Sequence, residues 1–124
     1  PISMLVEHRR YILQPGQQGA FLALMEGEGI PVERRILGRL LGFYTTEVGT
    51  LNQVIHLWGY DSFEDRQRRR QALAACPEWV RFLPKVLPLI REMENQLLVP
   101  APFAAVETLD WAPNGRHHGA ELSG

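Results

Sequence analysis

The stretch from Gly42 to Tyr60, GFYTTEVGTLNQVIHLWGY, decides the predicted fold. Its pattern predicts two strands, residues 40–48 and 51–60, and a tight turn at residues 49–50 makes them antiparallel neighbours. Side chains alternate along a strand, so one face of the second strand carries Asn52, Val54, His56, Trp58 and Tyr60. Aromatic bulk, hydrogen-bonding groups and a side chain that titrates near neutral pH share this face, which is typical of a pocket.

The segment before this hairpin predicts one strand and two helices. Residues 4–14 form the strand, which ends at the turn pair Pro15-Gly16. Residues 17–28 carry apolar side chains at helical spacing, and residues 27–31 break that helix. Pro31 then opens a second short helix, because a proline in the first turn sacrifices no hydrogen bond.

The segment after the hairpin predicts two further helices and a last strand. Asp61 or Ser62 caps a helix that ends near residue 75. Residues 77–86 predict a short buried helix that is interrupted at Pro84. Residues 91–99 predict the last strand, and Pro100 ends it.

The complete order is strand, helix, strand, strand, helix, strand. This order predicts an α+β fold, with a four-stranded antiparallel sheet and both helices on one face. We expect one domain over residues 1–103 and an arm or disordered tail over residues 104–124, where small and polar side chains dominate. The Arg116-His117-His118 run in the tail is not expected to bind metal, because adjacent histidines do not project together from regular structure.

Composition excludes several classes of protein. The chain has 124 residues, of which 45% are apolar and 22% charged, and its net charge of -1 argues against binding nucleic acid through broad phosphate neutralisation. Cys76 is the single cysteine, so no intrachain disulfide forms and a reducing compartment is expected. No apolar run approaches the roughly 18 residues of a membrane helix. We therefore expect a cytoplasmic protein without membrane insertion.

One layer of helices leaves the opposite face of the sheet open. We expect that open face to carry the apolar side chains of Phe43, Tyr11, Val54, Trp58 and Tyr60, more than a monomer usually exposes. A second copy across a two-fold axis would bury them, so the chain is predicted to be a homodimer. The polar members of the same face are then expected to line a cavity between the two sheets: Glu7, Arg9, Asn52 and His56.

Several motifs resemble those of the NIPSNAP family. The opening motif is Glu7-x-Arg9-x-Tyr11-x-Leu13-x-Pro15-Gly16, and the hairpin motifs are Gly42-Phe43-Tyr44, Thr46-Glu47, Leu51-Asn52, Val54, His56-Leu57-Trp58 and Tyr60. Further similar positions are Ser62, Asp65-Arg66, Pro77, Trp79, Phe82 and the ending from Glu94-Asn95 to Phe103. The resemblance covers residues 4–103, and the motifs occur in the family's order and spacing.

The resemblance implies a dimeric α/β barrel built from two ferredoxin-like halves. It implies no settled chemical activity. No cofactor is expected, because the sequence has no His-x-x-x-His metal motif and no glycine-rich nucleotide loop. Eukaryotic relatives are associated with mitochondria, whereas this chain lacks an Arg-rich transit segment, so it looks like a compact bacterial member. Barrels of the same architecture include small monooxygenases and haem-degrading enzymes, which is an analogy of fold only.

All candidate site residues except Tyr44 come from the predicted open face. His56 and Tyr11 are the candidate catalytic residues, with His56 as the acid-base group. The candidate ligand-binding residues are Glu7, Arg9, Tyr44, Asn52, Trp58 and Tyr60, and no metal site is predicted. Structural roles in a dimer core remain open for His56 and Trp58, and a structural ion pair across the dimer is favoured for Glu7 and Arg9.

Two classes of function follow. The first is a protein that binds a small organic ligand without turnover, and the second is an enzyme, either a cofactor-independent monooxygenase or an acid-base catalyst that uses His56. A third reading takes Pro1 as the general base of a tautomerase. The four arginines at positions 66, 68, 69 and 70 spread around a helix and predict a solvated face rather than an anion site. Cys76 is expected to be structural.

Overall fold

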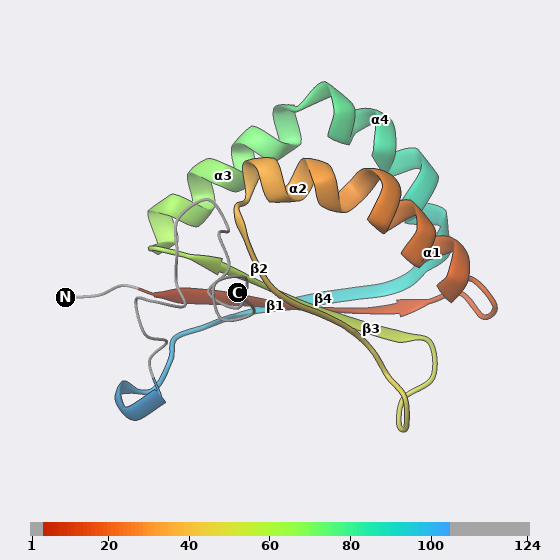
Figure 1. Ribbon diagram of the computed structural model, residues 1–124, viewed down its shortest axis with the longest axis horizontal. Helices are drawn as coiled ribbons and strands as arrows, with labels where there is room; N and C mark the ends of the chain where they lie inside the picture. The colour runs from red at the N-terminus through yellow and green to blue at the C-terminus, as the bar shows by residue number, and fades with distance from the viewer. Residues whose placement is uncertain (1–3, 105–124) are drawn as a thin grey trace, which may run out of the picture.

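Four strands form one antiparallel sheet in the order β2-β3-β1-β4, and the computed structural model describes residues 4–104 of the chain. The strands are β1 (Leu5–Leu13), β2 (Arg39–Thr45), β3 (Gln53–Tyr60) and β4 (Ile90–Leu98). The helices are α1 (Gln18–Leu24), α2 (Ile30–Ile36), α3 (Phe63–Ala75) and α4 (Pro77–Val86), and all lie on one face of the sheet (Figure 1). The predicted fold class and architecture are confirmed.

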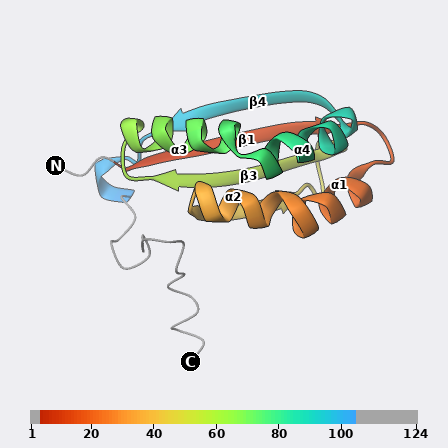
Figure 2. The same ribbon diagram turned by 90° about the horizontal axis from the view of Figure 1, so that it is seen from above.

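The helices form two parallel rows over the sheet. From above, α3 and α4 follow β1 and β4, whereas α2 and α1 lie on the side of β3 (Figure 2). Contacts join the rows, because α2 packs against α3 and α1 packs against α4. This arrangement leaves a layer between helices and sheet in which side chains from both rows meet.

The predicted break over residues 27–31 is wrong, because α1 and α2 belong to one continuous helical rod. A π-helical turn, Met25–Gly29, joins them, and the Ile30 N–H donates to the carbonyl of Met25 five residues back. Pro31 has no N–H to donate, and the wider turn before it absorbs that loss. Gly29 lets the rod approach α4, because a Cβ atom there would lie 2.9 Å from the ring of Phe82.

The start of α3 agrees with the prediction from its capping residues. The Ser62 hydroxyl accepts a hydrogen bond from the Asp65 N–H at 3.0 Å, and acidic side chains in the first turn favour the positive end of the helix dipole. The predicted interruption at Pro84 is wrong, because α4 continues through this proline. A 3-10 turn, Leu87–Leu89, leads directly into β4.

The connection between β2 and β3 is longer than predicted. β2 ends at Thr45 and β3 begins at Gln53, so residues 46–52 form a loop rather than a tight turn at residues 49–50. Asn52 closes this loop with a φ of 61°, a left-handed conformation that asparagine tolerates better than most residues. The first and last strands of the chain, β1 and β4, agree with the predicted bounds to within one residue at each end.

The predicted open face is the face that the helices cover. Alternation along the strands was predicted correctly, but Tyr11, Val54, Trp58 and Tyr60 are buried in the core, and Phe43 packs against it. Two apolar clusters lie between sheet and helices, one around Phe21 and Phe82 and one around Leu37 and Leu73. Both layers supply large apolar side chains to these clusters, and the aromatic residues of the sheet complete the core.

The opposite face of the sheet carries the alternate positions, Val6, His8, Arg10 and Ile12 on β1 and Gln53, Ile55 and Leu57 on β3.

Within residues 4–104, no helix is both long enough and apolar enough to cross a membrane. The predictions for Pro1, for the tail beyond Ala104 and for Arg116-His117-His118 lie outside the described residues.

Candidate functional site

A group of polar side chains lies between the two apolar clusters, under the helices. The register of β1 and β3 pairs Glu7 with Trp58 and Arg9 with His56, in the middle of both strands. These positions lie on the side of the sheet that faces the helices, so their charged groups lie at the centre of the protein interior. Polar residues at the centre of a core are costly unless they are paired, which makes this place a candidate site.

Glu7 is the hub of this polar group and is fully buried. Its carboxylate accepts hydrogen bonds from Arg9 at 2.7 Å and from Asn95 of β4 at 2.7 Å. Arg66 of α3 donates to both carboxylate oxygens at 3.1 Å, and the Tyr60 hydroxyl donates at 3.3 Å. Burial raises the pKa of Glu7, but the bonds from Arg66 and Asn95 and the charge of Arg9 lower it to about 2. Glu7 is therefore ionised and fully engaged at neutral pH.

The prediction that the four arginines of α3 form a solvated face is wrong for two of them. Arg66 reaches Glu7, and Arg70, one turn later, lines a cavity beneath the helices. Arg68 and Arg69 instead pair with Asp65, each at 2.9 Å. Positions 66 and 70 are in phase with the buried Leu73, which places them on the inner face of the helix.

His56 is fully buried among aromatic rings. Its ring stacks on Phe43 with centroids 4.9 Å apart and meets the edge of Tyr11 at 5.0 Å. The Trp58 indole N–H donates to Nδ1 at 3.0 Å, so in the neutral ring the proton resides on Nε2. Burial and the charge of Arg9 lower the pKa of His56 to about 3, against the opposing effect of Glu7. At neutral pH this imidazole is therefore an N–H donor and a weak base.

Glu33 of α2 is a second buried carboxyl, and the sequence reasoning did not select it. It is 3% exposed, and within residues 4–104 its Oε1 atom has no hydrogen-bond partner. Burial raises the pKa of Glu33 to about 7, although the charges of Arg70 and Arg9 act in the opposite direction. A carboxyl with a pKa near 7 exchanges protons at physiological pH, which is the property expected of a general acid or base.

The polar group opens onto a cavity of about 240 Å³ that is only partly enclosed, because the exposed side chains of Leu87 and Met93 also line it. Arg9, Tyr11, Glu33 and Arg70 form its polar wall. Apolar side chains from both helical rows and from β4 form the remaining wall: Phe21, Met25, Trp79, Leu83, Val86 and Met93. The Tyr11 hydroxyl accepts from Arg9 Nε at 3.0 Å, which leaves its own proton available for donation. The cavity thus combines hydrogen-bonding groups on one side with an apolar body on the other.

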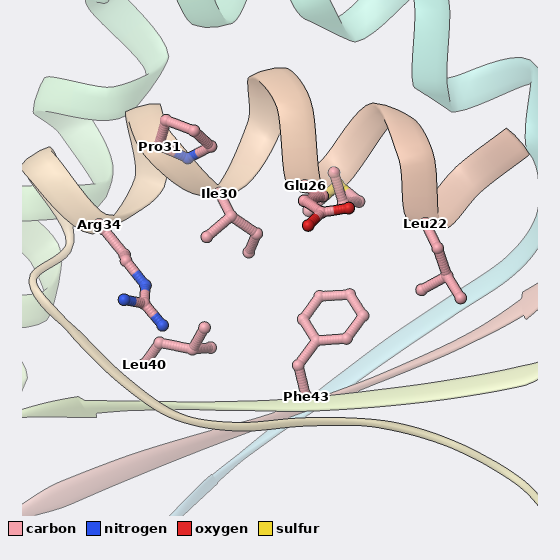
Figure 3. Close-up of a pocket in the computed structure, with 8 residues that line it drawn as sticks. Leu22, Glu26, Ile30, Pro31, Arg34, Leu40 and Phe43 are labelled. Atoms are coloured by element: carbon pink, nitrogen blue, oxygen red, sulfur yellow. The ribbon is translucent and has the colours of Figure 1, made fainter. Parts of the chain in front are cut away.

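A second, wider cavity of about 460 Å³ lies between the α1–α2 rod and β2. Leu22 and Ile30 point down from the rod and Phe43 points up from β2 (Figure 3). Glu26 and Arg34 are its charged members. Met25 lines both cavities, so its side chain forms part of the partition between them.

The structure brings six of the eight predicted site residues together under the helices: Glu7, Arg9, Tyr11, His56, Trp58 and Tyr60. The other two lie elsewhere, and for Asn52 the predicted position on a strand face was wrong. Asn52 lies in the loop before β3, and Tyr44 lies on the opposite face of the sheet, 55% exposed, where its ring covers Gly42. Glu7 and Arg9 form an ion pair within the chain, with Nη1 and Oε2 2.7 Å apart.

The residues that sequence reasoning missed are Glu33, Arg70, Arg66 and Asn95. For the two arginines, the available signal was their spacing from Leu73, which repeats the inner face of α3. For Glu33 the signal was its place beside Val32 in a short helix with few other polar positions turned inward. Asn95 shares a face with Arg9, but its pairing depends on the register of β4, which no local pattern sets.

Comparisons with known proteins agree with this architecture. The NIPSNAP family model matches residues 6–105. Protein NipSnap homolog from Dictyostelium discoideum is 35% identical over 94 residues, which are 76% of this chain and 41% of that protein. The chain therefore spans about two fifths of the length of this curated relative.

Solved structures are similar over most of the chain. An uncharacterized NIPSNAP-like domain protein from Burkholderia xenovorans has 45% sequence identity and a TM-score of 0.79, over 83% of this chain and 90% of that chain. A putative antibiotic biosynthesis monooxygenase from Bacteroides thetaiotaomicron has 20% identity and a TM-score of 0.59, over 85% and 95%. The second likeness is one of fold alone. Because the NIPSNAP family model matches residues 6–105, the chain belongs to the NIPSNAP family.

Proposed function

We propose that this NIPSNAP chain binds a small organic ligand in the cavity between its sheet and its helices. One observation carries the proposal: two residues that line the cavity, Glu33 and Arg70, have buried atoms, Oε1 and Nη1, with no hydrogen-bond partner within residues 4–104. Each such atom costs about 1–3 kcal/mol when it is left unpaired in the interior. A ligand that brings polar atoms into this region would recover part of that cost.

The composition of the walls supports an organic ligand over a bare ion. Trp79 and Phe21 offer flat aromatic surfaces, and Met25 and Leu83 offer adaptable apolar contact. A hydrated ion would gain nothing from those surfaces, whereas a ring or short chain would bury apolar area against them at about 25 cal/mol per Å².

Native mass spectrometry tests this function directly. The protein is purified without added ligand, its intact mass is measured under native conditions, and small molecules are extracted after denaturation. We expect a bound organic molecule that is lost from a variant in which Leu83→Trp fills the cavity. A matched control is Val80→Trp, on the exposed side of the same helix. A ligand that stays bound in the filled variant, or no retained ligand together with no binding of added aromatic compounds, would refute the proposal.

An acid-base enzyme is the second candidate, and Glu33 favours it. The carboxyl has a pKa of about 7 and lines the cavity, whereas the imidazole of His56 has a pKa of about 3. We therefore assign the acid-base role, if the ligand is turned over, to Glu33 and give His56 the role of a neutral N–H donor. The extracted ligand, returned to the protein in D₂O, should exchange an acidic C–H in the wild type and not in Glu33→Gln.

We also infer a homodimer that forms through the open face of the sheet. The side chains of Ile55, Leu57 and Tyr44 lie on that face, and the exposed Leu98 of β4 lies on it too, beside Val6 of β1. A charge on this face, Ile55→Arg, should convert a dimer to a monomer in light scattering. The control Val80→Arg places the same charge on the helical side. If light scattering shows that the wild type is a monomer at about 50 μM protein, a concentration at which weak dimers form, this inference is refuted.

A further inference from the structure

We propose that the ligand is a small organic monoanion whose oxyanion head, a carboxylate in the simplest case, binds Arg70 Nη1 beside Glu33. This inference rests on the proposed binding function and specifies the chemical class of its ligand. Arg70 enters from α3 and Glu33 from α2, and both line the same cavity. Each presents a buried polar atom that has no hydrogen-bond partner within the described part of the chain.

The balance of charge around the cavity favours an anion. Three guanidinium groups enter this region, those of Arg9, Arg66 and Arg70, and Glu7 is the one carboxylate that pairs with the first two. Glu33 adds a second negative charge only when it is ionised. With Glu33 protonated the region carries an excess of two positive charges, and with Glu33 ionised it carries an excess of one. An anionic ligand reduces the excess in both states.

The geometry of Arg70 identifies the place of the head. Arg9 and Arg66 already donate to the carboxylate of Glu7, at 2.7 Å and 3.1 Å. Arg70 shares neither of these bonds, and its Nη1 atom is buried although the residue as a whole is only half-buried. A planar guanidinium suits a carboxylate, because two N–H groups can meet two oxygens. The anion therefore belongs on Arg70 and not on its neighbours.

The apolar wall limits the body of the ligand. A cavity of about 150 Å³ accommodates benzene, so the observed volume of about 240 Å³ leaves room for one ring and a carboxylate. Trp79 and Phe21 provide the surfaces against which such a ring can lie. A single-ring acid is the smallest ligand that uses both walls.

Binding of an anion should be coupled to the protonation of Glu33. A negative charge beside this carboxyl favours its neutral form, so the ionised fraction of Glu33 takes up protons from solvent as the anion enters. The protonated carboxyl can then donate a hydrogen bond to the anion. The charged and titratable groups that act on Glu33 are Arg70 from α3 and Arg9, Glu7 and Tyr11 from β1.

Calorimetry with benzoate and its neutral amide, benzamide, tests the inference. We expect benzoate to bind the wild type roughly ten- to a hundredfold more tightly than benzamide, and Arg70→Gln to remove that preference. The control is Arg68→Gln, because Arg68 lies on the same helix, is exposed and pairs with Asp65. At pH 7, titrations in buffers of different ionisation enthalpy should show uptake of roughly half a proton. Glu33→Gln should keep the preference for benzoate and lose the proton uptake.

The outcomes separate this inference from the proposed function. Equal binding of benzoate and benzamide, or a preference that survives Arg70→Gln, overturns the anion site while the cavity keeps its binding role. Failure of both compounds, and of their two-ring and aliphatic analogues, overturns the anion site and the binding function together. Should Arg70→Gln unfold, Arg70→Lys keeps the charge without the planar fork and should reduce the preference for benzoate without abolishing it.

Discussion

Glu7→Gln is the substitution that most directly probes the polar centre of this fold. The amide keeps the shape of the carboxyl but removes its charge, and its nitrogen cannot accept a hydrogen bond. Two guanidinium groups, those of Arg9 and Arg66, then lie in the interior without their counter-charge. A buried pair that loses one partner destabilises a protein because the remaining charge is left uncompensated.

The magnitude follows from the pKa of Glu7, which the folded protein lowers from 4.5 to about 2. This difference corresponds to about 3 kcal/mol of stability at neutral pH. Because the folded-state pKa is depressed, the contribution is present above pH 4.5 and is lost as the pH falls towards 2. The wild type should therefore lose about 3 kcal/mol over this range from Glu7, and the glutamine variant should lack that component.

Urea unfolding, followed by tryptophan fluorescence at fixed protein concentration, measures both quantities. We expect Glu7→Gln to lower the free energy of unfolding at pH 7 by about 3 kcal/mol and to narrow the gap to the wild type at pH 3. The control is Glu64→Gln, an exposed position on α3, which should change stability by less than about 0.5 kcal/mol. A Glu7 variant within about 1 kcal/mol of the wild type at pH 7, with an unchanged acid slope, would contradict the assigned role.

Four further predictions follow from individual groups. Because burial raises the pKa of Glu33 from 4.5 to about 7, the wild type should lose about 3 kcal/mol of unfolding free energy as the pH rises from 5 to 8, and Glu33→Gln should not lose it. Equal pH dependence of the two proteins in urea unfolding would count against the raised pKa. In NMR titrations, His56 should remain neutral down to about pH 4, and a midpoint near 6.5 would show that it is not buried as described. Gly29→Ala should lower stability by about 1–3 kcal/mol despite its better helix propensity, because the new Cβ would lie 2.9 Å from a buried ring; a stabilised variant would refute the close approach. Ser62→Ala should cost about 1 kcal/mol through loss of the bond from the Asp65 N–H, and an unchanged melting temperature would argue against that cap.

The elements of the fold were largely predictable because local signals specify them. Each of these signals acts within a few residues of its own position. They are the alternation of apolar and polar side chains in residues 5–13 and 53–60, the Ser62 cap, and the prolines at positions 31 and 77. The continuity of the α1–α2 rod was missed, because a π turn has no sequence signature as clear as the glycines and the proline that suggested a break.

The side of the sheet that the helices cover could not be deduced from alternation. Periodicity shows which residues share a face, but both faces of this sheet carry apolar side chains, such as Trp58 on one and Leu57 on the other. The choice depends on helix packing across the whole domain. The polar partners of the site depend on the same packing, since Glu33 and Arg70 meet only when α2 and α3 lie side by side.

A crystal structure of the protein grown with benzoate tests the central claim most directly. We predict the carboxylate within hydrogen-bond distance of Arg70 Nη1 and Glu33, with the ring against Trp79 beneath the helices. A cavity that holds only water, with Arg70 and Glu33 paired to each other, would contradict the account.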